Sequence, residues 1–353
     1  MKIIVNNTAA SSGGAMTILK SFYNYLIESG AEKEHEWIFL LNDNHLKETD
    51  HIKVKVLDHV KKRWLSRLKF DLYDGKNYIN ELEPNVLFTL QNTIIFGTKC
   101  PQLLYMHQSL PFQKEKKFSF FKSTERKLAI YQYIIGKLIK ESIKKTEKTI
   151  VQTEWIRRAV IDSTNVSDEK VKSILPPLDD LSKYKNNTPF QKNCFFYPAG
   201  NYVYKNHQCI FEATTILNIN SINNFEIALT IDEKEKKRNI TYLGKMPFNK
   251  VIEKYNSSTL IFPSYIETLG LPLLEARDMG TIILSADCPY SREALEGYEN
   301  AYFFDPHRPK ELAILIEQVI KGQIIKKNIK KSEIKIENSW KEVVDNIIEQ
   351  ATL

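Results

Sequence analysis

The 353-residue sequence predicts an α/β protein built from two doubly wound parallel sheets in tandem. Short apolar runs alternate with longer helical patterns along most of the chain, which is typical of parallel strands joined by crossover helices. The chain is also longer than a single hydrophobic core comfortably supports, so two domains are expected. Ligands of such proteins bind at the carboxyl ends of the strands, and we expect the two sheets to face a central cleft.

Six apolar runs predict the strands of the first sheet. They are IIVNN near residue 3, WIFLLN near 37, HIKVKVL near 51, NVLFTL near 85, QLLYMH near 102 and KTIVQT near 148. Their nearly continuous apolar character indicates strands that are buried on both faces. We therefore assign residues 1–178 to an N-terminal domain. Residues 179–193 are polar, contain proline and lack periodicity, which predicts an interdomain linker.

A second series predicts another sheet of the same kind. Its runs are CFFYPAG near residue 194, FEIALTI near 225, NITYLG near 239, STLIFPS near 258, TIILSA near 281 and AYFFD near 301. Helical patterns such as HQCIFEATTILN and PFNKVIEKYNSS lie between them. Residues 194–328 thus form a predicted C-terminal domain. We expect residues 329–353 to form a final helix that returns to the N-terminal domain.

Charge and cysteine content narrow the function classes. The formal net charge of +7 comes from lysines spread along the chain, which favours an anionic ligand or membrane surface over sequence-specific reading of nucleic acid. Four separated cysteines form no metal-binding or disulfide pattern: Cys100, Cys194, Cys209 and Cys288. No run reaches the roughly 18 apolar residues of a membrane span. We expect a cytoplasmic chain that at most touches the inner face of the cell membrane.

Two strand ends of the first domain are candidate ligand contacts. Gly13 and Gly14 follow the first strand, where glycine allows close approach of the backbone and a helix start favours negative charge. The alternative is a simple helix-capping turn. His107 follows the apolar run LLYM, and its imidazole could orient a sugar hydroxyl at the cleft. A lone histidine is otherwise more often structural.

A glycine and a lysine follow the first strand of the second domain. In YPAGNYVYKNH, Gly200 ends the strand and Lys205 comes five residues later. A lysine in this position could hold a diphosphate and stabilise the negative charge of a leaving phosphate. The alternative is an ordinary surface lysine.

Glu267 and Glu275 are spaced eight residues apart in FPSYIETLGLPLLEA. If a helix begins near Thr268, the amides of Thr268, Leu269, Gly270 and Leu271 favour an anion, and Pro272 is acceptable in the first turn. Two helical carboxylates with this spacing lie roughly 12 Å apart, which is too wide for an acid/base pair acting on one bond. The spacing suits the two ends of an elongated ligand such as a nucleotide sugar.

These motifs together resemble the retaining GT-B glycosyltransferases of family 4. FPSYIETLGLPLLEA carries the E-x7-E spacing, and YPAGNYVYKNH resembles the donor-phosphate loop. ITYLGKMPFNKVIEKYNSSTLIFPS resembles the base-binding strand and the helix before the E-x7-E element. DCPYSREALEGYENAYFFDP and ENSWKEVVDNIIE are similar to later family motifs, and YMHQSLPF resembles the histidine motif of a bacterial surface-polysaccharide subgroup. Coverage is nearly complete from residue 195 onward and patchier before it.

The resemblance implies a GT-B fold with two Rossmann-like domains, the first for the acceptor and the second for the donor. It implies that Glu267 contacts the donor sugar and Glu275 the ribose, while His107 lies near the transferred sugar. The residues implied to hold or line the donor are Lys205, the amides of Thr268, Leu269, Gly270 and Leu271, and Gly13, Gly14, Gly200 and Gly244. Many family members have arginine where this chain has Asn201, so the cationic clamp is expected to be weaker or completed elsewhere.

The implied reaction moves a sugar from a UDP-, GDP- or dTDP-sugar to a hydroxyl, with retention at the anomeric carbon and without a metal or other cofactor. The sequence agrees in showing no DxD motif between apolar strands and no metal-ligand cluster. The rival predictions are a GT-B sugar-nucleotide epimerase, which needs no acceptor, and a non-catalytic nucleotide-sugar-binding protein.

The acceptor side rests on two basic and aromatic stretches. Residues 118–148 mix aromatic, aliphatic and lysine positions at helical spacing, and KKRW occupies residues 61–64. Such stretches can lie on anionic lipid, although packing against the domain with solvated lysines is the commoner outcome. They favour an oligosaccharide or lipid-linked acceptor, as in bacterial O-antigen or capsule synthesis.

Overall fold

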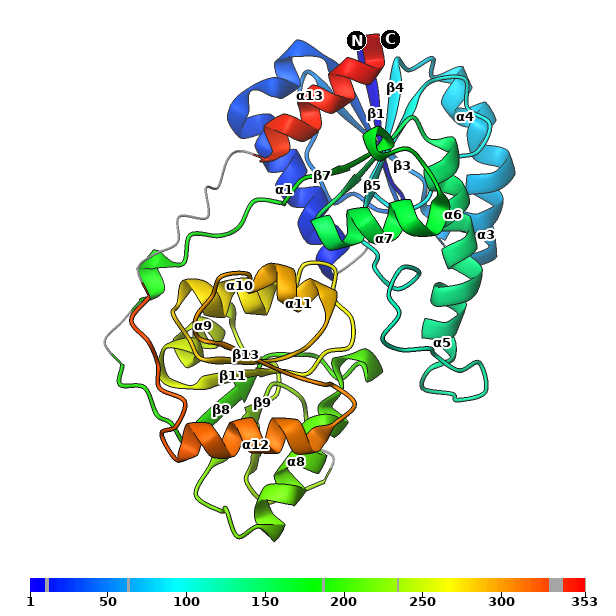
Figure 1. Cartoon of the computed structure of the whole chain (residues 1–353). Helices are drawn as coiled ribbons and strands as arrows, with labels where there is room; N and C mark the ends of the chain where they lie inside the picture. Colours follow the sequence, from blue (N-terminus) through cyan, green and yellow to red (C-terminus); the bar gives the residue numbers. More distant parts are fainter. Residues whose placement is uncertain (10–12, 62–63, 186–187, 234, 330–338, 353) are drawn as a thin grey trace. The chain divides into compact units, whose positions relative to one another are not determined.

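The chain divides into two compact units (Figure 1). The computed structural model describes all residues except 10–12, 62–63, 186–187, 234, 330–338 and 353. Unit 1 contains Met1–Phe112, Lys127–Pro177 and the C-terminal helix. Unit 2 contains Gln113–Arg126 and the described chain that begins at Leu178 and precedes that helix. Gln113–Arg126 therefore lies between two stretches of unit 1 in sequence but belongs to unit 2.

A parallel sheet forms the centre of unit 1. Within the described residues its strand order is β3-β2-β1-β4-β5-β6-β7, and all neighbouring strands run parallel. The strands are β1 (Lys2–Asn7), β2 (Glu36–Leu41), β3 (Ile52–Val56), β4 (Val86–Thr89), β5 (Gln102–Met106), β6 (Lys148–Val151) and β7 (Val171–Ser173). The central strands are almost wholly buried because helices cover both faces of the sheet.

Successive side chains of these strands point to opposite faces of the sheet, and the helices of unit 1 pack against both faces. These helices are α1 (Gly13–Ser29), α2 (Asp58–Lys61), α3 (Trp64–Lys69), α4 (Gly75–Glu81), α5 (Arg126–Ala129), α6 (Gly136–Lys145), α7 (Glu154–Thr164) and α13 (Ser339–Thr352). Phe70–Asp74 and Ile130–Ile135 are π-helical segments, and Ala31–Glu34 and Asp168–Lys170 are short 3-10 turns. The first π segment lies directly between α3 and α4.

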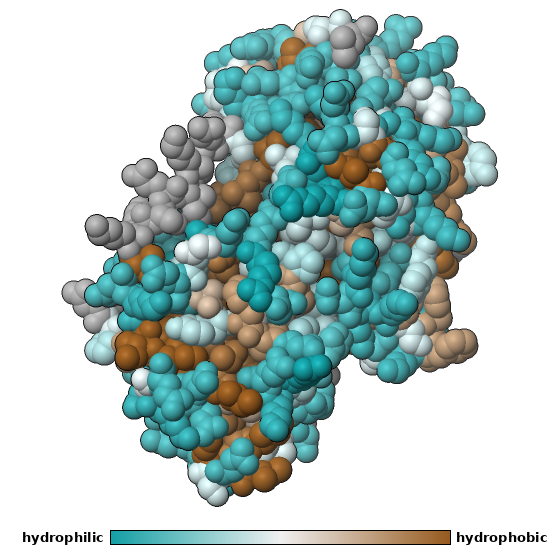
Figure 2. Space-filling model, viewed as in Figure 1, coloured by the Kyte–Doolittle hydropathy of each residue, from teal (hydrophilic) through white to brown (hydrophobic). Residues whose placement is uncertain are grey.

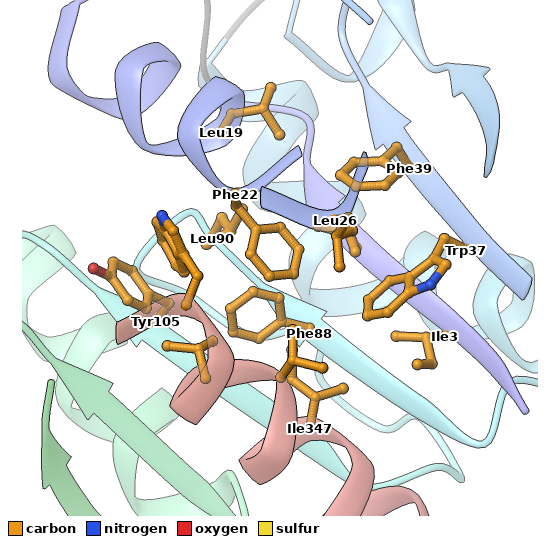
Figure 3. Close-up of a cluster of buried hydrophobic side chains, with 14 of the residues drawn as sticks. Ile3, Leu19, Phe22, Leu26, Trp37, Phe39, Phe88, Leu90, Tyr105 and Ile347 are labelled. Atoms are coloured by element: carbon orange, nitrogen blue, oxygen red, sulfur yellow. The ribbon is translucent and has the colours of Figure 1, made fainter. Parts of the chain in front are cut away.

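The largest core of unit 1 joins α1 and α13 to one face of the sheet. Figure 3 shows Phe22 of α1 among Trp37, Phe88 and other apolar side chains of the strands. Trp340 of α13 packs with its ring centroid 5.2 Å from that of Phe22 and donates a hydrogen bond from Nε1 to Ser21 Oγ at 2.8 Å. The C-terminal helix therefore completes the core of the first unit.

Unit 2 contains a second parallel sheet, with described strand order β10-β9-β8-β11-β12-β13. Its strands are β8 (Cys194–Tyr197), β9 (Glu226–Leu229), β10 (Ile240–Tyr242), β11 (Thr259–Phe262), β12 (Ile283–Ala286) and β13 (Ala301–Phe304). Its helices are α8 (His207–Ile219), α9 (Phe248–Ser257), α10 (Leu271–Asp278), α11 (Pro289–Ala294) and α12 (Pro309–Ile320), with 3-10 turns at Ser182–Tyr184 and Val203–Lys205. The view in Figure 2 shows a mostly hydrophilic surface with smaller hydrophobic patches.

The predicted fold class is confirmed: both sheets are parallel and doubly wound. Every apolar run named above contains a strand. The structure adds β7, whose three residues are too few to give a sequence signal. It also restricts the predicted basic helix at 118–148, because helical structure begins only at Arg126 and the preceding residues belong to unit 2. No described helix is long and apolar enough to cross a membrane.

Candidate functional site

The carboxyl ends of β8 and β11 meet at the point where the second sheet reverses direction. From β8 the chain continues to β9 and β10 on one side, and from β11 to β12 and β13 on the other. β8 and β11 are hydrogen-bonded neighbours, so the loops that follow them lie side by side. Open parallel sheets bind ligands at such switch points. The loop after β8 carries Gly200 and Lys205, and the loop after β11 carries Glu267.

Lys205 and Glu267 form an ion pair at this edge. Lys205 Nζ donates a hydrogen bond to Glu267 Oε1 at 2.6 Å, and the two side chains are only 14% and 15% exposed. The ammonium also lies 5.5 Å from the ring centroid of Tyr204 and 5.8 Å from that of Phe262. A largely buried ion pair of this kind holds both charges in a fixed position.

Buried polar contacts hold the two loops together. Tyr197, at the end of β8, donates its hydroxyl to the carbonyl of Lys205 at 2.8 Å and lies 2.8 Å from the hydroxyl of Ser264. Tyr290 of α11 donates to the carbonyl of Ser264 at 2.6 Å. The amide of Asn206 donates to the carbonyls of Pro263 and Pro306, at 3.1 and 3.0 Å. These bonds fix the backbone on either side of the ion pair.

The helix after Glu267 begins later than the sequence suggested. α10 starts at Leu271, and Gly270 precedes it with a left-handed φ of 72°. Thr268, Leu269 and Gly270 therefore lie in the connecting loop, and the helix begins three residues after Thr268. The left-handed residue prevents the helix from extending backward. Since only Glu275 is helical, the 12 Å estimate for two helical carboxylates does not apply.

Glu275 lies on the second turn of α10 and is largely buried. Tyr255 of α9 donates its hydroxyl to Glu275 Oε2 at 3.1 Å. Burial raises the pKa of Glu275 to about 7, with Tyr255 acting in the opposite direction and Asp179 adding to the increase. The carboxyl group therefore changes charge near neutral pH.

The remaining predicted donor contacts of unit 2 occupy neighbouring strand ends. Gly200 and Asn201 are exposed after β8, and a Cβ at Gly200 would lie 3.2 Å from the ring of Tyr202. Gly244 follows β10 with a φ of 62°, and a Cβ there would lie 3.4 Å from Asp232 Oδ1. Leu271 is half-exposed at the start of α10.

Three predicted site residues belong to unit 1. Gly13 and Gly14 are the exposed first residues of α1, and a Cβ on either would meet nothing within 4 Å. His107 follows β5, and its backbone N–H donates to Asn92 Oδ1 at 2.8 Å while Asn92 Nδ2 lies 3.4 Å from its Nε2. Burial and the charge of Arg67 lower the pKa of His107 to about 4, so the imidazole is neutral at pH 7.

Sequence reasoning missed a polar cluster beside His107. Asp71, from the π segment after α3, accepts hydrogen bonds from Gln91 and Thr93, and Arg67 lies 3.7 Å away. No recognisable motif links these residues, because they come from an irregular helix and from the loop after β4. The one sequence signal for this cluster was that Gln91 lies close to the end of a predicted strand, where ligands of parallel sheets bind.

It also missed the segment Gln113–Arg126, which contacts the loop after β11. The carbonyl of Glu115 lies 3.1 Å from Nε2 of His307, whose ring stacks on Tyr265 at 4.9 Å. The ammonium of Lys116 lies 5.5 Å from the ring centroid of Tyr265. Tyr265 precedes Glu267 by two residues. Within the described chain, no three His, Cys, Asp or Glu side chains are grouped as metal ligands.

Part of the chain matches a known protein family. Residues 191–336 match the family Glycosyl transferases group 1. A 190-residue stretch is 22% identical to the O-antigen chain mannosyltransferase RfbU of Salmonella typhimurium. That match covers 52% of this chain and 53% of the relative, or about half the length of each.

Solved structures share the fold of the whole chain. WaaG, a glycosyltransferase involved in lipopolysaccharide biosynthesis, aligns with a TM-score of 0.66 and 13% identity over 98% of this chain and 99% of its own. The lipopolysaccharide outer core galactosyltransferase WaaB gives 0.61 and 15%, covering 99% of both chains. Anabaena HepE, solved with UDP-glucose, gives 0.62 and 15%, covering 98% of this chain and all of its own. The fold is therefore that of GT-B glycosyltransferase structures.

Proposed function

We propose that this protein is a retaining glycosyltransferase of family 4 that moves a sugar from a nucleotide-sugar donor to a hydroxyl of an oligosaccharide acceptor. The observation that carries the proposal is the Lys205–Glu267 pair at the switch point of a group 1 glycosyltransferase domain. Its two charges suit the two groups of a donor, a diphosphate and a hydroxylated sugar.

Lys205 is proposed to stabilise the leaving diphosphate. Breaking the bond between the anomeric carbon and the phosphate oxygen places negative charge on that oxygen, and an ammonium fixed beside it lowers the barrier. In the donor-free protein the charge of Lys205 is balanced by Glu267, 2.6 Å away. A bound diphosphate supplies a second anionic partner, so Lys205 becomes shared between Glu267 and the phosphates. This arrangement requires no metal ion.

Glu267 is proposed to hold hydroxyl groups of the donor sugar, and Glu275 those of the ribose. A carboxylate accepts hydrogen bonds from adjacent hydroxyls, which orients the sugar ring. The leaving phosphate then takes the proton of the acceptor hydroxyl, which attacks from the face that the phosphate leaves. The new glycosidic bond keeps the configuration of the donor. A stable covalent adduct on Glu267 contradicts this route.

The relatives suggest the chemistry of the substrates. HepE has been solved with UDP-glucose, which makes a UDP-sugar the first donor to test. RfbU, WaaB and WaaG bear names from O-antigen and lipopolysaccharide synthesis, which supports a bacterial surface glycan as the acceptor. We propose a lipid-linked acceptor reached at the inner face of the cell membrane.

Exposed side chains of unit 1 support contact with that membrane. Tyr131, Tyr133 and Ile134 of the second π segment are exposed, with Lys127 and Lys137 nearby in sequence. Aromatic and aliphatic groups among lysines bind anionic bilayers. Ile134→Asp should weaken sedimentation with anionic vesicles at low salt, whereas Ile314→Asp, at a comparably exposed position of α12, should not. Equal binding of both variants and the parent protein contradicts the surface.

The function is tested first by a donor panel. UDP-, GDP- and dTDP-sugars are each added to the purified protein and the melting temperature is measured. A specific donor at a hundred times its Kd adds about 2.7 kcal/mol to the free energy of unfolding. The stabilising donor is then incubated with lipopolysaccharide-type acceptors. Hydrolysis or epimerisation of the donor without transfer contradicts the proposal.

A further inference from the structure

Unit 1 contains a buried carboxylate that the proposed transfer does not use. Asp71 is 2% exposed and lies in the π-helical segment Phe70–Asp74. π-helical turns are rare and often occur at functional sites. Its two oxygens accept different bonds: Oδ1 from Gln91 Nε2 at 3.2 Å and Oδ2 from Thr93 Oγ1 at 2.9 Å. Asp71 is thus attached twice to the loop that follows β4.

Through Gln91 the carboxylate is also linked to the loop after β1. Gln91 Oε1 accepts hydrogen bonds from Thr8 Oγ1 at 3.0 Å and from the backbone N–H of Ala9 at 3.2 Å. An ionised carboxylate can only accept, so it turns the Nε2 end of the amide toward itself and the Oε1 end toward β1. Asp71 therefore sets the orientation in which Gln91 joins the two loops, one of which leads toward Gly13.

Through Thr93 and Arg67 the carboxylate fixes the other side of the same loop. Arg67 of α3 donates from one terminal nitrogen to the carbonyl of Gln91 at 3.1 Å and to Thr93 Oγ1 at 3.2 Å. Its Nε lies 3.7 Å from Asp71, and its side chain is 23% exposed. Thr93 Oγ1 donates a hydrogen bond to Asp71 and accepts one from Arg67. The donor and acceptor directions within the cluster are therefore all determined.

The residue between these two anchors contacts His107. Asn92 has a left-handed φ of 68°, and it binds the backbone N–H of His107 and approaches its ring. A backbone conformation of this kind persists only where neighbours enforce it. Gln91 and Thr93, both bound to Asp71, flank Asn92 on each side. Asp71 therefore holds the turn that contains Asn92 through its two hydrogen bonds to Gln91 and Thr93, and Asn92 in turn binds His107.

We propose that Asp71 is a positioning residue for the acceptor side of the reaction, whose ionised form orders the loops after β1 and β4 and thereby His107. The inference rests on the proposed glycosyl transfer and specifies how unit 1 takes part in it. A hydroxylated acceptor bound at these strand ends would find its partners already oriented. Protonated or amidated Asp71 would leave Gln91 free to turn over.

The energetics support a functional rather than a stabilising role. Burial raises the pKa of Asp71 to about 6, although Arg67, Thr93 and Gln91 each act to lower it. Because the pKa in the folded protein is above that in the unfolded chain, stability is greatest below about pH 4 for this group and falls as pH rises through about 6. Keeping Asp71 ionised at pH 7 thus costs stability, which is typical of functional sites.

Asp71→Asn distinguishes a role of Asp71 in positioning from a role in stability. Asparagine has nearly the same shape but presents one acceptor and one donor, so it cannot accept from both Gln91 and Thr93. At pH 7.5 we expect an unchanged or higher melting temperature and an acceptor KM or kcat/KM worse by about tenfold. Hydrogen exchange should be about tenfold faster at Ala9, whose amide depends on Gln91. Glu32→Gln, another buried carboxylate of unit 1, is the matched control.

The pH profile gives an independent readout. Arg67 is the charged group of the described chain that faces Asp71. At saturating donor, acceptor kcat/KM should fall below about pH 6 in the parent protein, where Asp71 becomes protonated, and this limb should be absent in Asp71→Asn. Loss of melting temperature, donor binding and activity together in Asp71→Asn overturns the proposal, as does a variant with parental acceptor kinetics. Faster exchange at Ala9 in a protein without any transfer activity would keep the positioning role and reject the proposed function.

Discussion

At the residue scale, the proposed transfer depends most on Lys205 and Glu267. Lys205→Ala removes the ammonium and leaves the Glu267 carboxylate with 15% exposure and no charge partner at 2.6 Å. We expect kcat/KM for the donor to fall by about a hundredfold or more, as for loss of one preorganised electrostatic contact. Lys250→Ala, which removes an exposed pair with Glu253 on α9, is the control. Equal turnover of the two variants contradicts the assignment.

Glu275 provides a pH test of donor binding. Its pKa of about 7 means that roughly a tenth of the protein carries the ionised form at pH 6. If only the ionised form binds ribose hydroxyls, the donor Kd measured by calorimetry should be about tenfold weaker at pH 6 than at pH 8. Glu275→Gln should bind more weakly at pH 8 and show no such change.

Glu275→Gln also tests the direction in which Glu275 changes the stability of the protein with pH. The pKa of Glu275 is raised above its unfolded value, so the donor-free protein loses stability as pH rises through about 7. Glu275→Gln should therefore melt at an equal or higher temperature than the parent at pH 8. A parent donor affinity that is flat from pH 6 to 8 would argue against the ribose contact.

Sequence could indicate some of these residues and not others. Lys205 and Glu267 could be predicted as site residues because each carries a charge and lies in a loop that follows an apolar strand. The sequence could not indicate the residues that hold the loops around this pair, which are Tyr197, Ser264 and Tyr290. A buried hydroxyl group in an apolar run gives no periodic or spacing signal. Asp71 and Arg67 were missed for a related reason: their partners are separated by about twenty residues of intervening chain.

At the element scale, the turn into α10 is the most constrained backbone of the site. Gly270 has a φ of 72°, and a Cβ there would lie 3.3 Å from Leu273 Cδ1 and 3.4 Å from the ring of Tyr290. Gly270→Ala should lower the free energy of unfolding by about 1–2 kcal/mol through strain. It should also reduce transfer, because Tyr290 holds Ser264 in the same loop.

Gly280→Ala is the matched control for that change. Gly280 follows α10 with a φ of 70°, but a Cβ there meets nothing within 4 Å. Denaturant titration should show a similar loss of stability in both variants, whereas transfer should fall only in Gly270→Ala. A parallel loss of activity in both would mean that general strain, rather than the position of this loop, governs turnover.

Most elements could be predicted because a buried parallel strand leaves a compact apolar run. Element ends were harder to predict. The left-handed conformation of Gly270, which sets the start of α10, is permitted by glycine but not required by it. The stretch 118–148 has helical periodicity throughout, yet tertiary structure assigns its first residues to unit 2. Periodicity alone cannot distinguish these outcomes.

At the scale of the whole molecule, the C-terminal helix joins the chain's end to its first unit. Trp340 is 2% exposed and packs against Phe22 and Tyr105. Trp340→Ala should destabilise unit 1 by about 3–5 kcal/mol through the cavity it leaves. Lys341→Ala, at the exposed neighbouring position, should have little effect. Denaturant unfolding measures both, and an unchanged midpoint for Trp340→Ala contradicts the packing.

The two-sheet organisation was predictable from length and alternation, whereas the substrates were not. The proposed transfer selects its donor base, donor sugar and acceptor through backbone groups and pocket shape, which leave no motif in a single sequence. The positive charge of the chain indicates anionic ligands in general and does not identify them.

The central claim is retaining glycosyl transfer that depends on Glu267. The most direct measurement incubates the stabilising nucleotide sugar with acceptor and determines the anomeric configuration of the product by NMR, for the parent protein and for Glu267→Gln. We predict a product with the configuration of the donor, and turnover at least about a hundredfold slower in the variant. An inverted product, or parental turnover in Glu267→Gln, would contradict the account.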